Sequence, residues 1–497
     1  MEQRPDIRYA PSLRTGLALP KFRPGIGAGK LPVLLLLTLL AVKFALLAID
    51  PQVRFFFGDS ASYLWSAESG WIPPDRSFTY PYLIRVTAVA THWLPALAIA
   101  QSLCGVLVAL VLFYLLTTTF SLARPIAFVV TVLFSVGPEQ LFYERMMMAE
   151  AIGSMMFVLC LLCGFLYLRR RNWIWLCLGP LCGIAAVSLR MNLLPVVLGF
   201  SVLPIFAAWS DPQGAAGRMS WRQLAVHTLI AMLATSLLHT GYKQWRAYEH
   251  GGMKPHDYIA YGGYFKLGLV TPLVKPEHLR GLGLPDDLLS RDIFALDDPH
   301  TRESQLWQAN GLIDLIRKSV GDGKGNRTAG KIAERALRSD PLGLVRLAYL
   351  TTWDYFNRAE VEHRMADDLG NRMPDAELEA KLRQNYGFEY PAPEAWPSPT
   401  RNWFGTSAPW LIACMLLLAP LGLATILAGW RHMRRPSALL GVASLGVVAG
   451  HVLFSHIISF RYLHAFPFFV LLNIGALAAL WMRQVEPAPQ LDLPLTG

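Results

Sequence analysis

Apolar runs of about 20 residues recur along this chain, and each is long enough to cross the hydrocarbon core of a membrane as a helix. Inside lipid the backbone finds no water, so such a run must satisfy its own hydrogen bonds as a helix. Charged residues make up 16% of the sequence, against about 25% in a typical soluble protein, which leaves too few to cover an aqueous surface. The sequence therefore predicts an all-α polytopic membrane protein.

About ten transmembrane helices are expected. They cover residues 31–49, 97–117, 126–136, 150–168, 173–189, 193–209, 224–239, 410–429, 437–456 and 465–482. The third and seventh of these segments are short. The first follows a long basic segment and lacks a small-residue cleavage signature, so we expect a retained helix and not a signal peptide.

Arginine and lysine are concentrated in alternate connections of this threading. The predicted inner side carries the basic N-terminal segment, Arg124, Arg169–Arg171, Arg218, Arg222, the basic residues of 431–435, and Arg483. The positive-inside rule then places both termini in the cytoplasm, in a multi-pass protein of the cytoplasmic (inner) membrane. These connectors also account for the net charge of +10, and no basic domain indicates a nucleic-acid partner.

The threading divides the chain into five parts. They are a cytoplasmic segment (1–30), a seven-helix module (31–241) with a first outer loop (50–96), a large extracytoplasmic cap (242–409), a three-helix module (410–482) and a cytoplasmic tail (483–497). The cap sequence predicts short amphipathic helices joined by Pro/Gly turns. Within it, the segment GNRTAGKI has the glycine spacing of a phosphate-binding loop. It lacks the Ser/Thr that would bind Mg²⁺ and no strand precedes it, so nucleotide binding is not expected.

Ionisable side chains are costly at membrane depth, and those of this chain gather where helices reach the predicted outer side. Four turns carry them: Asp50, Asp59, Glu68, Asp75 and Arg76; then Glu139, Glu144, Arg145 and Glu150; then Arg190 with Asn192; and finally His456, Arg461, Tyr462 and His464. One interpretation is a set of interfacial anchors to lipid phosphates. The other is an outer-face active site in which arginines bind the phosphate of a lipid and a carboxylate accepts a proton from a hydroxyl.

Several of these segments resemble the GT-C glycosyltransferases, membrane enzymes that include protein O-mannosyltransferases and the aminoarabinose transferase of lipid A. The segments are GDSASYL and PDRSFTYPYLIRV in the first outer loop, YERMMMAEAIGSMMFVLCLL, SLRMNLLPVVLGF and FRYLHAFPFFVLL. The resemblance implies a GT-C-like fold, a polyprenyl-phosphate-linked sugar donor and an inverting transfer with an acidic base in the first outer loop. Here that loop has one Asp followed by Ser, where many members have an Asp-Glu pair.

On this basis Asp59 is the candidate base, and its alternative role is to cap a short interfacial helix. Glu150 is expected to orient Arg145 or the acceptor, with Glu144 as its substitute; a carboxylate at the start of a helix also suits the helix dipole. The candidate residues for the donor phosphate are Arg461, Tyr462, Arg190 and Arg76. Arginines that extend to the lipid headgroups are the alternative.

In the cap, the segment YEHGGMKPHDYIAYGGYFK carries Lys254, His256, Asp257 and Lys266. It is either a lid over the lipid-linked sugar or a solvated surface loop. No cofactor is expected. A divalent metal on His456, His464, Glu144 and Glu150 is left open, although no close ligand spacing supports one.

The expected partners are therefore the polyprenyl-phosphate sugar, a glycan, lipid or protein acceptor, and membrane lipids. Two other functions stay open. A lipid-linked substrate transporter or flippase would place ionisable groups near the midplane on inverted repeats. Another outer-face ligase or transferase would use the same clustered turns.

Overall fold

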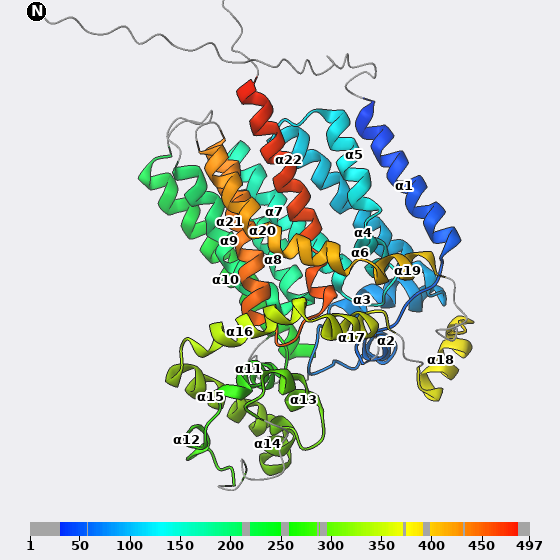
Figure 1. Ribbon diagram of the computed structural model, residues 1–497, viewed down its shortest axis with the longest axis vertical. Helices are drawn as coiled ribbons and strands as arrows, with labels where there is room; N and C mark the ends of the chain where they lie inside the picture. Colours follow the sequence, from blue (N-terminus) through cyan, green and yellow to red (C-terminus); the bar gives the residue numbers. More distant parts are fainter. Residues whose placement is uncertain are drawn as a thin grey trace, which may run out of the picture.

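The computed structural model describes residues 30–485 except 57, 211–218, 250–257, 286–287, 289–295, 371–373, 391–397 and 431–432. Throughout this described part the regular structure is helical (Figure 1). Long helices form a bundle, and shorter helices form a cap at one end of it. The chain is a helical, multi-pass membrane protein.

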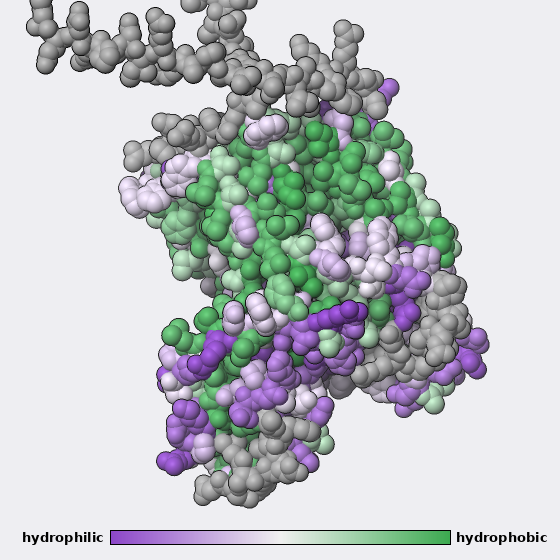
Figure 2. Space-filling model, in the orientation of Figure 1, coloured by the Kyte–Doolittle hydropathy of each residue, from purple (hydrophilic) through white to green (hydrophobic). Residues whose placement is uncertain are grey.

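A helix lies at each of the ten segments expected to cross the membrane. The helices are α1 (Leu31–Ile49), α4 (Pro95–Tyr114), α5 (Arg124–Ser135), α7 (Glu150–Arg170), α8 (Ile174–Leu189), α9 (Leu194–Trp209), α10 (Trp221–Glu249), α20 (Ala408–Gly429), α21 (Arg434–Phe454) and α22 (Phe466–Val485). Among the described residues, eight helices are long and apolar enough to span a membrane, whereas α5 and α8 are apolar but shorter. Figure 2 shows the apolar belt of the bundle above the polar cap.

The expectation of a short seventh helix was wrong. Helix α10 has 29 residues and runs to Glu249, past the expected boundary at 241. Its last two turns carry polar residues that end the apolar run. They do not end the helix, because helical hydrogen bonds are made by the backbone whatever the side chains are.

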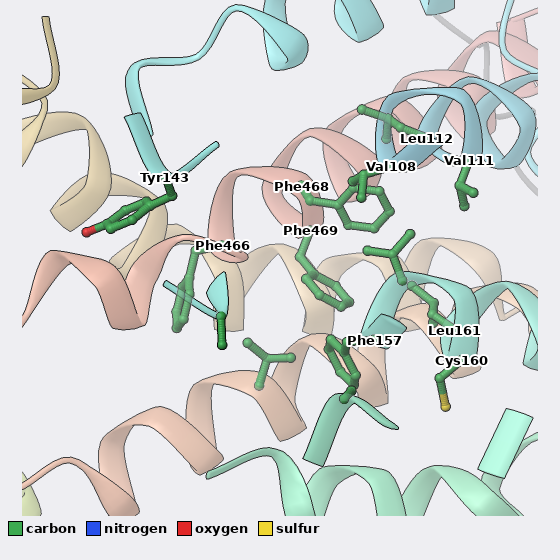
Figure 3. Packing of buried hydrophobic residues seen from close by; sticks show 14 of the residues in the cluster. Val108, Val111, Leu112, Tyr143, Phe157, Cys160, Leu161, Phe466, Phe468 and Phe469 are labelled. Atoms are coloured by element: carbon green, nitrogen blue, oxygen red, sulfur yellow. The ribbon is translucent and has the colours of Figure 1, made fainter. Parts of the chain in front are cut away.

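Aromatic and branched side chains fill the centre of the bundle (Figure 3). Phe469 of α22 packs against Phe157 of α7 with ring centroids 5.8 Å apart. Nearby lie Val108 and Leu112 of α4. These contacts join the first and last parts of the sequence, so the N-terminal and C-terminal modules share one core.

A buried ion pair lies within the bundle. Lys43 of α1 is 2.7 Å from the carboxylate of Glu144, and both side chains are almost inaccessible to solvent. Gln140 donates a hydrogen bond to the same carboxylate, and Lys43 also donates to the carbonyl of Ser135. Breaking one partner of such a pair leaves a buried charge without compensation, so Glu144 has a structural role here.

Gly105 of α4 makes room for this pair. A Cβ at position 105 would lie 1.8 Å from the Oε1 of Glu144, whose position is held by Lys43 and Gln140. We expect Gly105→Ala to destabilise the protein by about 1–3 kcal/mol, as overpacking of a core does. Thermal unfolding of the purified protein in detergent measures this change.

The matched control is Gly199→Ala in α9, where a Cβ would meet no atom within 4 Å. Because alanine favours a helix more than glycine does, this variant should melt at or slightly above the wild-type temperature. Equal melting of the two variants would contradict the packing described for Gly105.

The first loop after α1 is held against the segment between α5 and α7. Arg54 pairs with Met146 in a parallel backbone bridge, and the buried ion pair of Arg54 with Asp50 measures 3.0 Å. Hydroxyls of Ser398 and Thr400, from the end of the cap, also bind Asp50. The first loop, the segment before α7 and the end of the cap thus meet around the buried pair of Asp50 and Arg54.

The cap consists of short helices, as the sequence predicts. They are α11 (Gly262–Val270), α12 (Pro276–Leu279), α13 (Arg302–Trp307), α14 (Leu312–Val320), α15 (Asp322–Ser339), α16 (Gly343–Trp353), α17 (Arg358–Asp368), α18 (Ala376–Tyr386) and α19 (Pro399–Gly405). Helices α11 to α15 enclose a second hydrophobic core of their own. The segment GNRTAGKI lies inside α15, and Asn326 there binds the backbone of residues 260 and 264, so this segment is a structural helix and not a phosphate loop.

Specific contacts connect the cap to the bundle end. The amide of Tyr261 donates to the carbonyl of Pro74, and Tyr386 of α18 donates to Glu68 of α2 (Asp59–Ser69). The hydroxyl of Tyr355 lies 3.2 Å from the ring of His451 in α21. The cap is therefore fixed over the bundle end at several separate places.

Candidate functional site

A cavity of about 620 Å³ lies where the cap meets the bundle. On the side of the bundle end, the cavity is lined by the first turn of α2, by the loops before and after α2, and by the turn between α21 and α22. On the side of the cap, it is lined by α11, α13 and α17. The charged and aromatic residues of its lining are Phe56, Asp59, Asp75, Arg76, Phe265, Glu303, Trp307, Arg364, Asp367, Asp368, His456, Arg461 and Tyr462. Two of the four sequence-predicted turns, the first and the last, thus line one polar cavity together with the cap.

Asp59 is bound by two arginines on the cavity wall. Its Oδ1 lies 2.7 Å from Arg76, and its Oδ2 lies 2.9 Å from Arg461. The Asp59 side chain keeps 25% of its surface accessible, so the ion pairs face solvent in the cavity. Burial alone would lower the pKa of Arg76, but the carboxylates of Asp59 and Asp75 raise it above its usual value, so this guanidinium stays charged.

The local fold of α2 explains how Asp59 reaches the cavity. Gly58 precedes it with φ at +86°, a conformation that glycine adopts without steric cost, and Asp59 becomes the first helical residue. Ser60 fixes this turn by donating to the carbonyl of Met147. Gly58, and not Asp59, is the N-cap of α2, so Asp59 does not hold the cap position that the alternative role assigned to it.

Arg461 lies on a short 3₁₀ turn, residues Phe460–Leu463, between α21 and α22. Its guanidinium stands over the rings of Phe56 and Tyr462, with distances of 4.6 Å and 5.1 Å to their centroids. The aromatic faces stabilise the cation and hold it in place. Its charge is directed at Asp59, although the two residues are separated by most of the chain.

Asp368, which sequence analysis missed, holds this 3₁₀ turn from the cap side. It accepts hydrogen bonds from the amide of Phe460 (2.6 Å) and from the hydroxyl of Ser459 (3.0 Å). A longer contact joins it to the amide of Arg461. Burial raises the pKa of Asp368 to about 6, against the opposing charge of Arg461. It lies in the unremarkable segment MADDLG, and no sequence signal marked it.

Arg190 and Glu150 lie near this group without lining the cavity. Arg190 donates to the carbonyl of Arg461 and stands 5.9 Å from the ring centroid of Tyr462. Glu150 is the first residue of α7 and is buried, and its Oε2 has no hydrogen-bond partner among the described residues.

The remaining predicted residues lie elsewhere. Glu144 is in the buried pair with Lys43 and takes no part in the cavity lining. Lys254, His256 and Asp257 fall outside the described residues. Lys266 is exposed on α11, and its neighbour Phe265 is the residue that lines the cavity.

The sequence leaves two histidines open as metal ligands, His456 and His464. His456 lines the cavity, and burial together with nearby arginines lowers its pKa to about 3, so its ring is neutral at physiological pH. His464 is buried, and its Nδ1 lies 3.1 Å from the hydroxyl of Ser154. Within the described part of the chain, no three His, Cys, Asp or Glu side chains are grouped as metal ligands.

Comparisons of the chain with protein-family models, with curated proteins and with solved structures found no match. The resemblance to GT-C glycosyltransferases stays a prediction from the sequence.

Proposed function

We propose that this protein is an integral membrane glycosyltransferase. It transfers a sugar from a polyprenyl-phosphate-linked donor to an acceptor hydroxyl. The observation that supports this most is the placement of Asp59 between Arg76 and Arg461 on the wall of a cavity at the end of the bundle. A proton acceptor and two phosphate-binding cations are the groups that such a transfer needs.

Both arginines are held by Asp59 when no substrate is bound. A donor phosphate brings oxygens that guanidinium groups bind in two-point contacts. On the proposed mechanism the phosphate takes over Arg461 and Arg76, and the carboxylate of Asp59 is released. Donor binding therefore activates the base.

The released Asp59 accepts the proton of the acceptor hydroxyl as its oxygen attacks the anomeric carbon. The bond between that carbon and the phosphate oxygen breaks, and the polyprenyl phosphate departs with the electron pair. Arg461 and Arg76 stabilise the negative charge on the leaving phosphate. Attack from the side opposite the leaving group inverts the anomeric configuration.

The charge distribution supports a cap on the extracytoplasmic side of the cytoplasmic membrane. Arginines gather at the bundle end opposite the cap, where α5 and α21 begin and α22 ends (Figure 1). The positive-inside rule assigns that end to the cytoplasm. A lipid-linked donor in the outer leaflet then has its phosphate at the level of the cavity.

Incubation of the purified protein in lipid vesicles with a polyprenyl-phosphate sugar labelled on the sugar tests the proposal. We expect label to leave the lipid only when an extract of envelope glycans and lipids is added, and the product to have the inverted anomeric configuration. A retained configuration would contradict the mechanism. Label that crosses the vesicle membrane and stays on the lipid would indicate a transporter instead.

The pH dependence of transfer should reflect Asp368. With a pKa of about 6, this carboxyl is mostly ionised above that pH and becomes protonated below it. Protonation removes the charge that holds the 3₁₀ turn of Arg461, so we expect transfer to fall as the pH drops through about 6. Rates measured between pH 5 and 8 should show this fall in the wild type.

Asp368→Asn should have a low rate at every pH, without a fall near pH 6. A fall of unchanged size in this variant would exclude Asp368 as its origin.

A further inference from the structure

The cap side of the cavity carries an aromatic pair that the mechanism does not use. Trp307, the last residue of α13, meets Phe265 of α11 edge to face, with ring centroids 5.5 Å apart. Both line the cavity, yet Trp307 keeps 51% of its surface exposed. About half of the Trp307 surface is thus exposed, and its apolar ring can contact a molecule bound in the cavity.

Charged groups line the same cavity as this aromatic pair. Arg364 of α17 lies 2.7 Å from Glu303 of α13, and it also binds Glu360 at 2.8 Å. Asp367 lines the cavity one turn further along α17. Glu303, Arg364 and Asp367 thus offer both hydrogen-bond acceptors and donors beside the exposed ring.

An aromatic face bordered by carboxylates and a guanidinium fits the chemistry of a pyranose ring. One face of such a ring carries C–H groups, which pack on an aromatic surface. Its edge carries hydroxyls, which donate to carboxylates and accept from arginine. An acyl chain would make no hydrogen bond with these charged groups, and a phosphate would be repelled by Glu303 and Asp367.

We infer that the cap wall around Trp307, Phe265, Glu303 and Arg364 is a binding subsite for a pyranose of the acceptor, so that the acceptor is a carbohydrate. This rests on the proposed function, which assigns the arginines at the bundle side of the cavity to the donor phosphate. The two substrates then bind at opposite walls of the same cavity.

The subsite is built on a rigid frame. Helices α11 and α13 pack into the separate core of the cap, with Leu306 beside Gly268. The amide of Tyr261, just before α11, binds the carbonyl of Pro74, next to the pair Asp75–Arg76. The position of the aromatic face is therefore coupled to the loop that carries the donor-binding arginine.

Sugar binding can be measured without donor or turnover. The probes are methyl β-D-glucopyranoside and methyl α-D-mannopyranoside, added at millimolar concentration to the full-length protein in nanodiscs and observed by saturation-transfer NMR. We expect at least one of them to bind with its C–H face saturated most strongly.

Trp307→Ala should weaken that binding about tenfold, and Trp307→Phe should recover part of it. Trp173→Ala is the matched control, because Trp173 has a similar exposure of 56% and precedes α8 in the bundle.

Absence of binding by both glycosides, or equal binding by the wild type and Trp307→Ala, would overturn the inference. The proposed transfer from the lipid donor is tested separately, by the vesicle assay. Binding that depends on Trp307 in a protein that never releases sugar from the lipid donor would support the subsite and reject the glycosyltransferase assignment. Glu303→Gln is the second variant, and it should weaken binding while the Trp307–Phe265 pair stays intact.

Discussion

Replacing Asp59 with asparagine should abolish sugar transfer and, at the same time, strengthen the binding of polyprenyl phosphate. Loss of a general base typically costs about 10²–10⁴ in rate, and asparagine cannot accept the proton. The same change removes the negative charge from between Arg76 and Arg461. Asp59 then no longer competes with phosphate for either guanidinium, and Arg76 keeps only its pair with Asp75. Transfer assays and binding of labelled polyprenyl phosphate measure the two effects separately.

The opposite signs of these effects make the result specific. A merely misfolded variant would lose binding together with activity. Asp340→Asn is the matched control, because Asp340 also pairs with an arginine, Arg346 at 2.5 Å, but on the surface of the cap. It should change neither quantity. Wild-type activity in Asp59→Asn would remove Asp59 as the base.

Replacing Arg461 with alanine should have the second largest effect, and this effect should fall mainly on the donor. Removing one partner of a hydrogen-bonded, partly buried charge pair typically costs about 2–5 kcal/mol, which is a loss of about thirtyfold or more in affinity. Arg461→Lys should recover only part of this, because an ammonium lacks the two-point geometry of a guanidinium. Titration of labelled polyprenyl phosphate against each variant measures the change.

Arg338→Ala provides the control for Arg461, since Arg338 forms a surface pair with Glu334 of the same helix. Surface pairs contribute little, so donor affinity should stay at the wild-type value. If Arg461→Ala weakened donor and acceptor binding equally, Arg461 would hold the fold of the cavity and would not bind phosphate.

The helices could be predicted from the sequence because apolar composition and helix length follow directly from the membrane. The start of α1 and the start of α7 agree with expectation to the residue, whereas α10 extends beyond its apolar part. The pairing of Lys43 could not be predicted, because a lysine inside an apolar run either pairs across the bundle or extends its ammonium to the membrane surface. The structure shows that it pairs with Glu144.

The sequence predicts that the turns of Asp59 and Arg461 lie together at one end of the bundle. It does not predict which residues of the cap line the cavity. Trp307, Arg364 and Asp368 lie on short helices without a distinctive motif, and their positions depend on how a separately packed core docks on the bundle. Such docking is decided by contacts between segments far apart in sequence, and local patterns do not carry that information.

The most direct measurement is mass spectrometry of the lipids that remain bound to the purified protein. We expect polyprenyl phosphate or its glycosylated form to co-purify with the wild type, to be enriched in Asp59→Asn and to be depleted in Arg461→Ala. The absence of any polyprenyl phosphate from both the wild type and Asp59→Asn would contradict it, as would equal amounts in all three proteins.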